Sequence, residues 1–288
     1  MYLMKKHLRK VIDASPGTEI VVSDDCSSDG SVEYIKKYFP NVIIVTNTVR
    51  QGFAGNINMG VSKATGDIVI LINTDVEPEK GYLIPLLSHF RNPDVFAVGC
   101  LEKSIENGNM ILRGRGIAHW EKGYYIHSRG DTEKRDTAWV SGGSGAFRKS
   151  MWDTLGGMDK LYNPFYWEDI DLSYRARKAG WKTVFEQKSI IRHYHEEGKI
   201  KREYSPEDVK KIVYRNQYIF IWKNLTYPPL ILKHLFWAPI RIIQSIYFGN
   251  YLHPTGFFSA LGRLFPIIRY RLRCVKYRYS DNDLAIWR

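Results

Sequence analysis

A short polar segment that contains a carboxylate, Asn73-Thr74-Asp75, directly follows an apolar run at 68–72. The run is rich in β-branched residues and is typical of a strand buried on both faces of a parallel sheet. Ligands of open α/β sheets bind at the carboxyl ends of such strands. A carboxylate there can hold a divalent cation, and the cation can hold a diphosphate. A plain turn would use the same residues, so this segment alone leaves both interpretations open.

A pair of adjacent carboxylates, Asp24 and Asp25, follows the short strand that we expect at 19–23. A glycine-rich turn at 52–60 then leads into a helix. Its spacing differs from the G-x-G-x-x-G dinucleotide fingerprint. Phosphate contact and close packing of backbone on backbone therefore explain these glycines equally well.

Aromatic residues lead into adjacent carboxylates at the start of a helix, where Trp167 precedes Glu168 and Asp169. Negative charge is stabilised at a helix N-terminus, so capping is one interpretation. Capping needs only one carboxylate, however. An aromatic wall beside a carboxylate is also how a general base for a sugar hydroxyl is built.

Two further segments could contribute to a site. Gly143 lies in a glycine-rich strand or turn at 139–147, where small residues let a ligand or another chain segment approach the backbone closely. His193 and His195 follow the strand expected at 180–191. A lone histidine is usually structural, but two at a strand end beside a carboxylate cluster are also candidates for metal ligands.

The elements that must position these residues alternate between strand and helix. This alternation predicts an α/β fold with a mostly parallel central sheet. A chain of 288 residues with 44% hydrophobic residues can bury a sizeable core, as one large or two small domains. Its three cysteines are far apart in the sequence, which excludes a disulfide framework or a zinc spacing and favours a reducing cytosol.

Positive charge is concentrated in the last third of the chain. Residues 199–288 carry 16 Lys and Arg against 5 Asp and Glu, a net charge of +11, whereas the whole chain has +12. Apolar and aromatic runs at 230–248 and 257–278 are interrupted by charged residues, so they are poor transmembrane spans and fair interfacial helices. Packed helices with solvated basic faces, an anionic membrane surface and nucleic acid are the alternatives, and no recognition motif supports the last.

The sequence contains six motifs whose types and order along the chain resemble those of glycosyltransferase family 2. Within that family, they most resemble the bacterial rhamnosyltransferases of surface polysaccharides. The resemblance runs from about residue 20 to about 224. It rests on the segments Asp24–Ser31, Gly52–Gly60, Asn73–Asp75, Gly156–Asp159, Glu168–Leu172 and His193.

The resemblance implies a GT-A fold, which is Rossmann-like. The catalytic domain would span 1–198, with a nucleotide-binding half at about 1–100 and an acceptor half at about 101–198. A basic, aromatic-rich helical extension would span 199–288. The implied site residues are Asp24, Asp25, Gly52, Asn58, Asn73 and Asp75 for the nucleotide sugar, Asp75 and His193 for the metal, Asp169 with Glu168 for catalysis, and Trp167 and Gly143 for the acceptor. Asn73 stands at the first position of the family's D-x-D motif.

The implied activity is inverting transfer of a sugar from a nucleotide-sugar donor to a hydroxyl of a glycan or lipid-linked acceptor. Mn²⁺ or Mg²⁺ would hold the diphosphate, and Asp169 would be the base. Such an enzyme would act in cell-surface polysaccharide synthesis, in the cytoplasm or on the inner face of the membrane, without nucleic acid. The alternatives are an inactive or truncated member that binds nucleotide or a partner, and a nucleotidyltransferase, whose basic phosphate loop is missing here.

One departure from the family concerns the start of the chain. Family members begin with an apolar strand that is central in the sheet, whereas here a helix is expected from Met1. Loss of a central strand would leave unpaired backbone groups on two neighbours, each costing about 1–3 kcal/mol if buried. We therefore expect either that the natural chain starts upstream of Met1 or that this is a truncated, poorly active copy.

Overall fold

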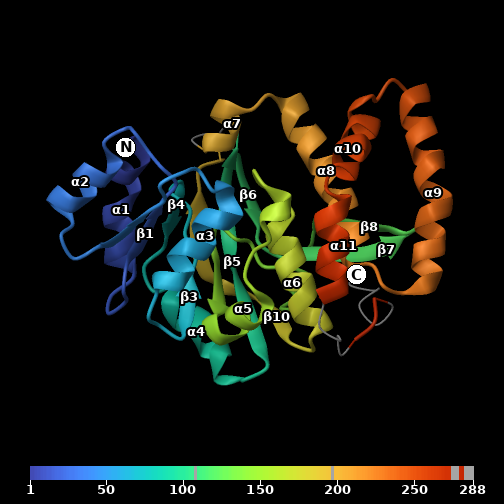
Figure 1. Cartoon of the computed structure of the whole chain (residues 1–288). Helices are drawn as coiled ribbons and strands as arrows, with labels where there is room; N and C mark the ends of the chain where they lie inside the picture. The colour runs from blue at the N-terminus through green and yellow to red at the C-terminus, as the bar shows by residue number, and fades with distance from the viewer. Residues whose placement is uncertain (107–108, 196–197, 274–278, 282–288) are drawn as a thin grey trace.

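The structure, a computed structural model, describes residues 1–106, 109–195, 198–273 and 279–281. The main strands lie in the centre of the molecule, and helices cover them. The last four helices stand together on one side of the molecule (Figure 1). The elements in chain order are α1 (Tyr2–Ala14), β1 (Val21–Asp24), α2 (Ser31–Tyr38), β2 (Ile43–Thr46), α3 (Gly52–Lys63), β3 (Ile68–Ile70), β4 (Val76–Pro78), α4 (Leu83–Ser88), η1 (His89–Arg91), β5 (Val95–Glu106), β6 (Asn109–Arg113), β7 (Gly116–Glu121), β8 (Tyr124–Arg129), β9 (Gly145–Arg148), α5 (Lys149–Leu155), η2 (Lys160–Tyr162), α6 (Glu168–Lys178), β10 (Lys182–His193), α7 (Lys199–Glu203), α8 (Pro206–Asn224), α9 (Pro228–Tyr247), α10 (Leu252–Leu261) and α11 (Leu264–Arg273).

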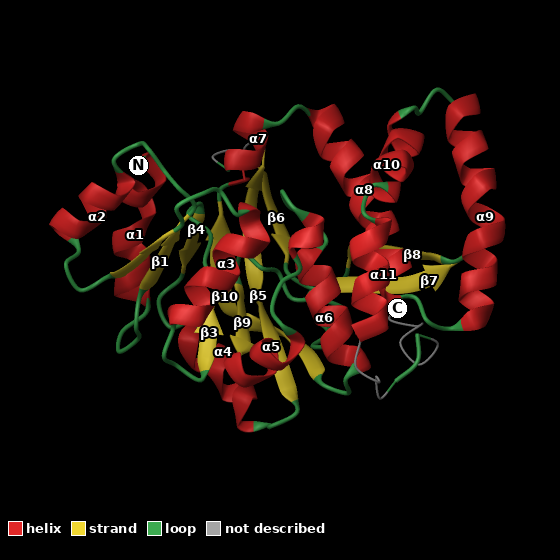
Figure 2. Ribbon diagram, in the orientation of Figure 1, coloured by secondary structure: helices red, strands yellow, loops and turns green. Residues whose placement is uncertain are grey.

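The α/β class is confirmed, but the main sheet is mixed rather than mostly parallel. Its strand order is β3-β9-β5-β10-β4, with β6 paired to β5 (Figure 2). Only β5 and β10 run parallel; the other pairs in this sheet are antiparallel. Parallel neighbours need a crossover connection that is usually a helix. Between β5 and β9 the described chain forms only strands and loops, so β9 enters the sheet antiparallel to both of its neighbours.

The strand expected at 68–72 is shorter and less central than predicted. β3 covers three residues and pairs with β9 on one edge only. Within the described ranges, β1 pairs only with β2, in a separate two-stranded parallel sheet. Residues of β1 and of β3 line the same large cavity, so among the described residues no strand joins the two sheets. The additional strand expected from the family stays a prediction.

The helix α8 packs into the same core as the strands β7 and β8 and the helix α6. Its N-terminus has the expected capping chemistry, because Ser205 accepts the backbone N–H of Asp208 at 3.1 Å and Pro206 occupies the first turn. The shared core is rich in aromatic residues and includes Trp120, Tyr125 and Tyr174 with Phe220 of α8. The helices predicted for the last third are therefore present, and α8 packs on the body before residue 199.

Buried charges fasten α8 to α6. The Asp171 carboxylate on α6 accepts hydrogen bonds from Lys223 Nζ at 2.8 Å and from Arg175 Nε at 2.7 Å, and it is fully buried. Burial by itself would raise the pKa of Asp171, but the charges of Arg175 and Lys223 hold that pKa well below its usual range. Loss of one partner would leave an uncompensated buried charge. This contact therefore fixes the start of α6, where Asp169 lies.

The two longest C-terminal helices do not cross a bilayer on their own. Within the described ranges, every helix is either too short or too rich in polar residues to span the hydrocarbon core of a membrane.

Candidate active site

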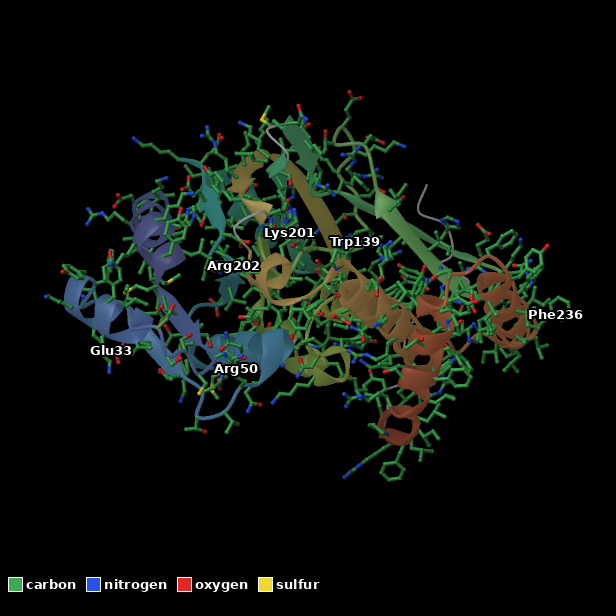
Figure 3. The ribbon with its side chains drawn as sticks, turned by 90° about the horizontal axis from the view of Figure 1, so that it is seen from above. Glu33, Arg50, Trp139, Lys201, Arg202 and Phe236 are labelled. Carbon is green, nitrogen blue, oxygen red and sulfur yellow. The ribbon has the colours of Figure 1, made fainter. Side chains whose placement is uncertain are left out.

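A cavity of about 1270 Å³ contains most of the residues that the motifs single out. Its walls come from β1, the start of α3, the loop after β3, the start of α6, the end of β10, and α7. Arg50 beside α3 and Lys201 on α7 add positive charge to these walls (Figure 3). The predicted residues on the walls are Asp25, Gly52, Asn73, Asp75, Gly143, Glu168, Asp169 and His193.

Strand pairing brings a carboxylate and two histidines together at the end of β10. His193 lies opposite Val76 in the antiparallel β10–β4 pair, so its ring reaches Asp75 with 3.5 Å between Nε2 and Oδ1. On its other side, His193 Nδ1 lies 3.2 Å from Oε1 of Glu102 on β5. His195 Nε2 lies 2.8 Å from the same oxygen, and the two histidine rings stack with centroids 3.7 Å apart.

Charge within this cluster changes the pKa values of its members. Burial would lower the pKa of His193, but hydrogen bonds and charges from Asp75 and Glu102 outweigh burial and raise it to about 9. Burial would raise the pKa of Glu102, but the two histidines bring it down to about 2. The pKa of Asp75 is lowered too, since the hydrogen bond and charge of His193 overcome the effect of burial. In this form His193 is a cation between two carboxylates.

The same groups fit a divalent cation. One ligand atom each from Glu102, His193 and His195 lies within 4.8 Å of the other two, and Asp75 borders this group. Carboxylate oxygens and imidazole nitrogens are common metal ligands once the histidines have lost their protons. Gly198 keeps the chain close to Asp75, because a Cβ at position 198 would lie 2.8 Å from Asp75 Oδ2. The cluster is therefore a candidate metal site.

Sequence reasoning did not identify Glu102, and of the two candidate histidines it gave only His193 as an implied metal ligand. Glu102 follows the buried residues of β5, as Asp75 follows the apolar run at 68–72. That pattern, a carboxylate after an apolar strand, was a usable signal. The pairing of β5 with β10 was not visible in the sequence, and this pairing is what sets Glu102 beside both histidines.

Asp169 lies at the start of α6, beside the glycine-rich segment before β9. Its Oδ2 accepts the N–H of Gly142 at 3.3 Å, and its Oδ1 accepts the N–H of Ile170 at 2.8 Å. Burial raises the pKa of Asp169, although these backbone hydrogen bonds oppose the change. A carboxylate with a raised pKa that borders a cavity is suited to general-base work.

Glu168 is the more deeply buried of the two adjacent carboxylates, and its Oε2 has no hydrogen-bond partner in the described chain. Burial and the charge of Asp169 raise the pKa of Glu168 well above its usual value. Two neighbouring carboxyl groups in such a place do not both ionise readily. Of the two, Glu168 is therefore the harder to ionise.

The structure places Tyr166, not Trp167, on the wall of the cavity. Both residues have a positive φ, at 69° and 79°, so this turn points successive side chains in different directions. The Trp167 ring is buried, with centroids 4.9 Å from His127 and 5.2 Å from Phe220. Tyr166 is exposed and lines the cavity. The aromatic wall expected beside Asp169 thus comes from the neighbouring residue.

Asp25 and Asp24 take different places at the end of β1. Asp25 lines the cavity and accepts the N–H groups of Gln51 at 2.7 Å and Gly52 at 3.0 Å, so it fixes the start of α3. Asp24 is buried away from the cavity, where it accepts the Ser27 N–H at 3.1 Å. Gly52 has a φ of 72°, and a Cβ there would lie 2.8 Å from the Asn163 side chain.

Asn58 serves the fold rather than the cavity wall. Its amide donates to Met158 O at 2.7 Å and accepts from Met158 N at 2.9 Å, which ties α3 to the loop before α6. Asn73 and Gly143 do line the cavity and are neighbours: Asn73 N donates to Gly143 O at 2.9 Å. A Cβ on Gly143 would lie 2.5 Å from Asn73 Nδ2, so only glycine fits there without a shift.

Comparisons with known proteins agree on one group of enzymes. A model described as Glycosyl transferase family 2 matches residues 4–156. The chain is 25% identical over 210 residues to N-acetylglucosaminyl-diphospho-decaprenol L-rhamnosyltransferase of Mycobacterium tuberculosis (strain CDC 1551 / Oshkosh). That match covers 61% of this chain and 66% of the relative, so the chain spans just under two thirds of the relative's length.

Two solved structures show the same fold. GalNAc-T7 with UDP, GalNAc and Mn²⁺ has a TM-score of 0.64 at 20% identity, over 88% of this chain and 51% of that one. The mannosyltransferase PcManGT from Pyrobaculum calidifontis, in complex with GDP-Man and Mn²⁺, has a TM-score of 0.54 at 17% identity, over 94% and 75%. The GT-A fold expected from the motifs is confirmed.

Proposed function

Because the chain belongs to glycosyl transferase family 2, we propose that it is an inverting, metal-dependent glycosyltransferase. Its donor would be a nucleotide sugar, and its acceptor would be a hydroxyl group of a glycan or lipid-linked glycan in cell-surface polysaccharide synthesis. The observation that carries this proposal is the shared cavity. The Asp75–His193–Glu102 cluster and the carboxylate of Asp169 line the same space.

Asp75, Glu102, His193 and His195 would hold Mn²⁺ or Mg²⁺, which when bound would neutralise the diphosphate of the donor and of the departing nucleoside diphosphate. The imidazole nitrogens are less suited to Mg²⁺, which prefers oxygen ligands, so Mn²⁺ is the first ion to test. Asp25 and Gly52 at the start of α3 would border the nucleotide, and Asn73 and Gly143 would border the sugar.

Asp169 would remove the proton from the acceptor hydroxyl as the acceptor oxygen forms its bond to the anomeric carbon. The bond from that carbon to the diphosphate oxygen breaks, and the electron pair leaves with the nucleoside diphosphate. Attack from the face opposite the leaving group inverts the anomeric configuration. The raised pKa of Asp169 makes it a stronger base than an ordinary aspartate. Tyr166 would form the aromatic wall for the acceptor sugar.

The test is nucleoside diphosphate release from a panel of nucleotide sugars, with Mn²⁺, with Mg²⁺ and with EDTA. We expect slow metal-dependent hydrolysis of one donor, and its loss in Asp75→Ala and Glu102→Gln. Donor binding without any turnover on a panel of glycan acceptors would favour the alternative of an inactive family member. Consumption of a nucleoside triphosphate and a sugar phosphate would identify a nucleotidyltransferase instead.

We also propose that the acceptor is presented at an anionic membrane surface on the cytoplasmic side. The name of the mycobacterial relative specifies a prenyl-diphosphate-linked sugar. Residues 209–273 of this chain contain ten Lys and Arg and no Asp or Glu. Large apolar side chains are exposed on α9 and α11, among them Phe236 at the outer edge of the molecule (Figure 3) and Leu272. Basic residues beside exposed apolar ones are typical of interfacial helices.

A further inference from the structure

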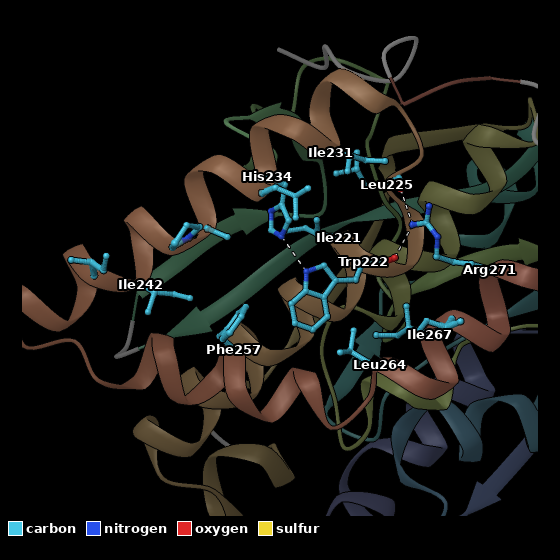
Figure 4. Close-up of a pocket in the computed structure, with 15 residues that line it drawn as sticks. Ile221, Trp222, Leu225, Ile231, His234, Ile242, Phe257, Leu264, Ile267 and Arg271 are labelled. Carbon is cyan, nitrogen blue, oxygen red and sulfur yellow. Dashed lines mark hydrogen bonds between the residues drawn. The ribbon is translucent and has the colours of Figure 1, made fainter.

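A second cavity, of about 690 Å³, lies among the four C-terminal helices α8, α9, α10 and α11 (Figure 4). Its volume is in the range of about 300–1,000 Å³ that is common for small-molecule sites. Thirteen of its fifteen lining residues are apolar or aromatic, including Ile221, Ile242, Phe257 and Ile267. Leu235 and Ile268 lie at its mouth, where they are exposed to solvent.

The polar side chains on this wall form hydrogen bonds with one another or with backbone carbonyls. Trp222 Nε1 donates to His234 Nε2 at 3.1 Å (Figure 4). On its other side, His234 Nδ1 donates to the carbonyl of Gly123 at 3.0 Å. Burial lowers the pKa of His234 to about 4, so this ring is neutral. Arg271 donates to the carbonyls of Trp222 and Leu225 at 2.8 Å. A ligand in this cavity therefore meets mostly hydrocarbon, and Arg271 is the charged side chain among the described lining residues.

Residues of this apolar cavity and of the catalytic cavity come next to each other at the turn between α10 and α11. Arg263 lines the catalytic cavity, and the next residue, Leu264, lines the apolar one. On α8, Arg215 lines the catalytic cavity, and Ile221 is the first residue of that helix on the apolar wall. Six residues along a helix span about 9 Å. The lining residues of the two cavities are therefore close neighbours in sequence at this turn and along α8.

Arg215 and Arg263 place two positive charges at this junction. Both side chains line the catalytic cavity, and the pKa of Arg215 is lowered by burial and by the charge of Arg263. Within the described ranges neither of them forms an ion pair with a carboxylate, and Arg215 donates only to neutral oxygens of Asn216, Tyr162 and Asn163. Two neighbouring arginines without a counter-ion favour an anion with several oxygens, such as a phosphate or diphosphate.

We propose that the junction is the acceptor site for an amphiphile: a diphosphate-linked lipid whose diphosphate lies at Arg215 and Arg263 and whose hydrocarbon chain fills the apolar cavity. The proposal rests on the proposed function and specifies its substrate class. Asn216, next to Arg215, donates to the carbonyl of Tyr166 at 2.8 Å, so α8 is fixed against the segment that leads to Asp169. A lipid held on α8 would thereby present its sugar to the base.

The test measures binding of farnesyl diphosphate, farnesol and inorganic diphosphate by calorimetry in EDTA, which keeps diphosphate from binding through a metal. The head variant is Arg263→Ala, with Arg269→Ala as its matched control, because Arg269 is exposed on α11 and lines neither cavity. The chain variant is Leu235→Glu. Its control is Leu232→Glu, since the two leucines lie on α9 at 64% and 68% exposure but only Leu235 lines the cavity.

We expect Arg263→Ala to weaken farnesyl diphosphate and inorganic diphosphate by about tenfold or more, as loss of a charged hydrogen bond does, and to leave farnesol unchanged. Leu235→Glu should weaken farnesyl diphosphate and farnesol and leave inorganic diphosphate unchanged. Both controls should bind all three probes like the wild type. Leu235→Ser, a milder change at the same surface position, repeats the chain test if Leu235→Glu lowers the thermal stability.

Equal affinities in wild type, Arg263→Ala and Leu235→Glu would overturn the proposal. A switch from dimer to monomer in Leu235→Glu, without any change in probe binding, would also overturn it, because a second copy of the chain would then cover the cavity. Mn²⁺-dependent binding of the nucleotide sugar is measured in parallel on every variant. If the wild type shows no Mn²⁺-dependent binding of a nucleotide sugar, the proposed function is refuted. If it binds the nucleotide sugar but the variants bind the lipid probes like the wild type, only this inference is refuted.

Discussion

Metal binding at the Asp75–His193–Glu102 cluster should release a proton and should strengthen as the pH rises. The pKa of His193 is raised to about 9, so the metal-free protein holds a proton on this ring at neutral pH. A histidine must be neutral to bind a metal. Metal affinity therefore increases with pH, because the neutral form of His193 gains population as the pH increases toward 9.

The size of the effect comes from the same value. At pH 7, displacement of a proton from a group with a pKa of about 9 costs about 3 kcal/mol, or about 100-fold in apparent affinity. The apparent affinity for Mn²⁺ should therefore rise about tenfold per pH unit from pH 6.5 to 8.5, with about one proton released per ion bound. An ordinary histidine, with a pKa of about 6.5, would change the apparent affinity only about twofold over this range.

Calorimetric titration with Mn²⁺ in buffers of different ionisation enthalpy gives both the affinity and the number of protons released. Asp169→Asn is the control, because Asp169 forms no contact with the histidine cluster in the described hydrogen bonds and should keep the same pH dependence. A pH-independent affinity between 6.5 and 8.5, or binding without proton release, would refute the assignment of His193 as a metal ligand that is protonated in the metal-free protein.

Three further perturbations test other parts of the site. Asp169→Asn should keep donor binding but lower transfer by about 100-fold or more, as loss of a general base does, in a coupled assay of nucleoside diphosphate release. Lys223→Met leaves Asp171 without one of its buried partners and should reduce the free energy of unfolding in urea by about 3–5 kcal/mol. Lys233→Glu with Arg269→Glu should weaken sedimentation with anionic vesicles, since each surface cation contributes on the order of 1 kcal/mol.

Each of these three has its own contradicting result. Transfer at the wild-type rate in Asp169→Asn would make that residue a helix cap. Lys211→Met is the control for Lys223, because Lys211 pairs with Asp208 at an exposed surface and its loss should cost less than about 1 kcal/mol; equal effects of the two variants would contradict the buried-charge argument. Vesicle binding that is unchanged by charge reversal would indicate that the basic faces are merely solvated.

The sequence by itself determined which local segments carry the chemistry. Apolar runs that end in polar residues identified Asp25, Asp75 and His193, and the aromatic-acidic start of a helix identified Asp169. These are local patterns: the period of a strand or helix and the chemistry of its end are readable from consecutive residues. The order of the motifs then indicated the family, which the comparison confirms for residues 4–156.

The tertiary structure decided which of these segments meet. Glu102 joins the two histidines only because β5 pairs with β10, and the mixed sheet arises because β9 enters antiparallel between β3 and β5. Trp167 is buried and Tyr166 exposed because of two consecutive positive φ angles, which the residue types do not announce.

Pairing partners and long-range contacts depend on how distant elements pack, and that information is spread over the whole chain. Arg263 and Leu264 look like parts of one more basic, apolar helix in the sequence. Only the packing of α11 on α8 puts one on the wall of the catalytic cavity and the other on the wall of an apolar cavity. The residues that do chemistry could be found from local pattern, while the space around them, which selects the substrate, is a property of the folded chain.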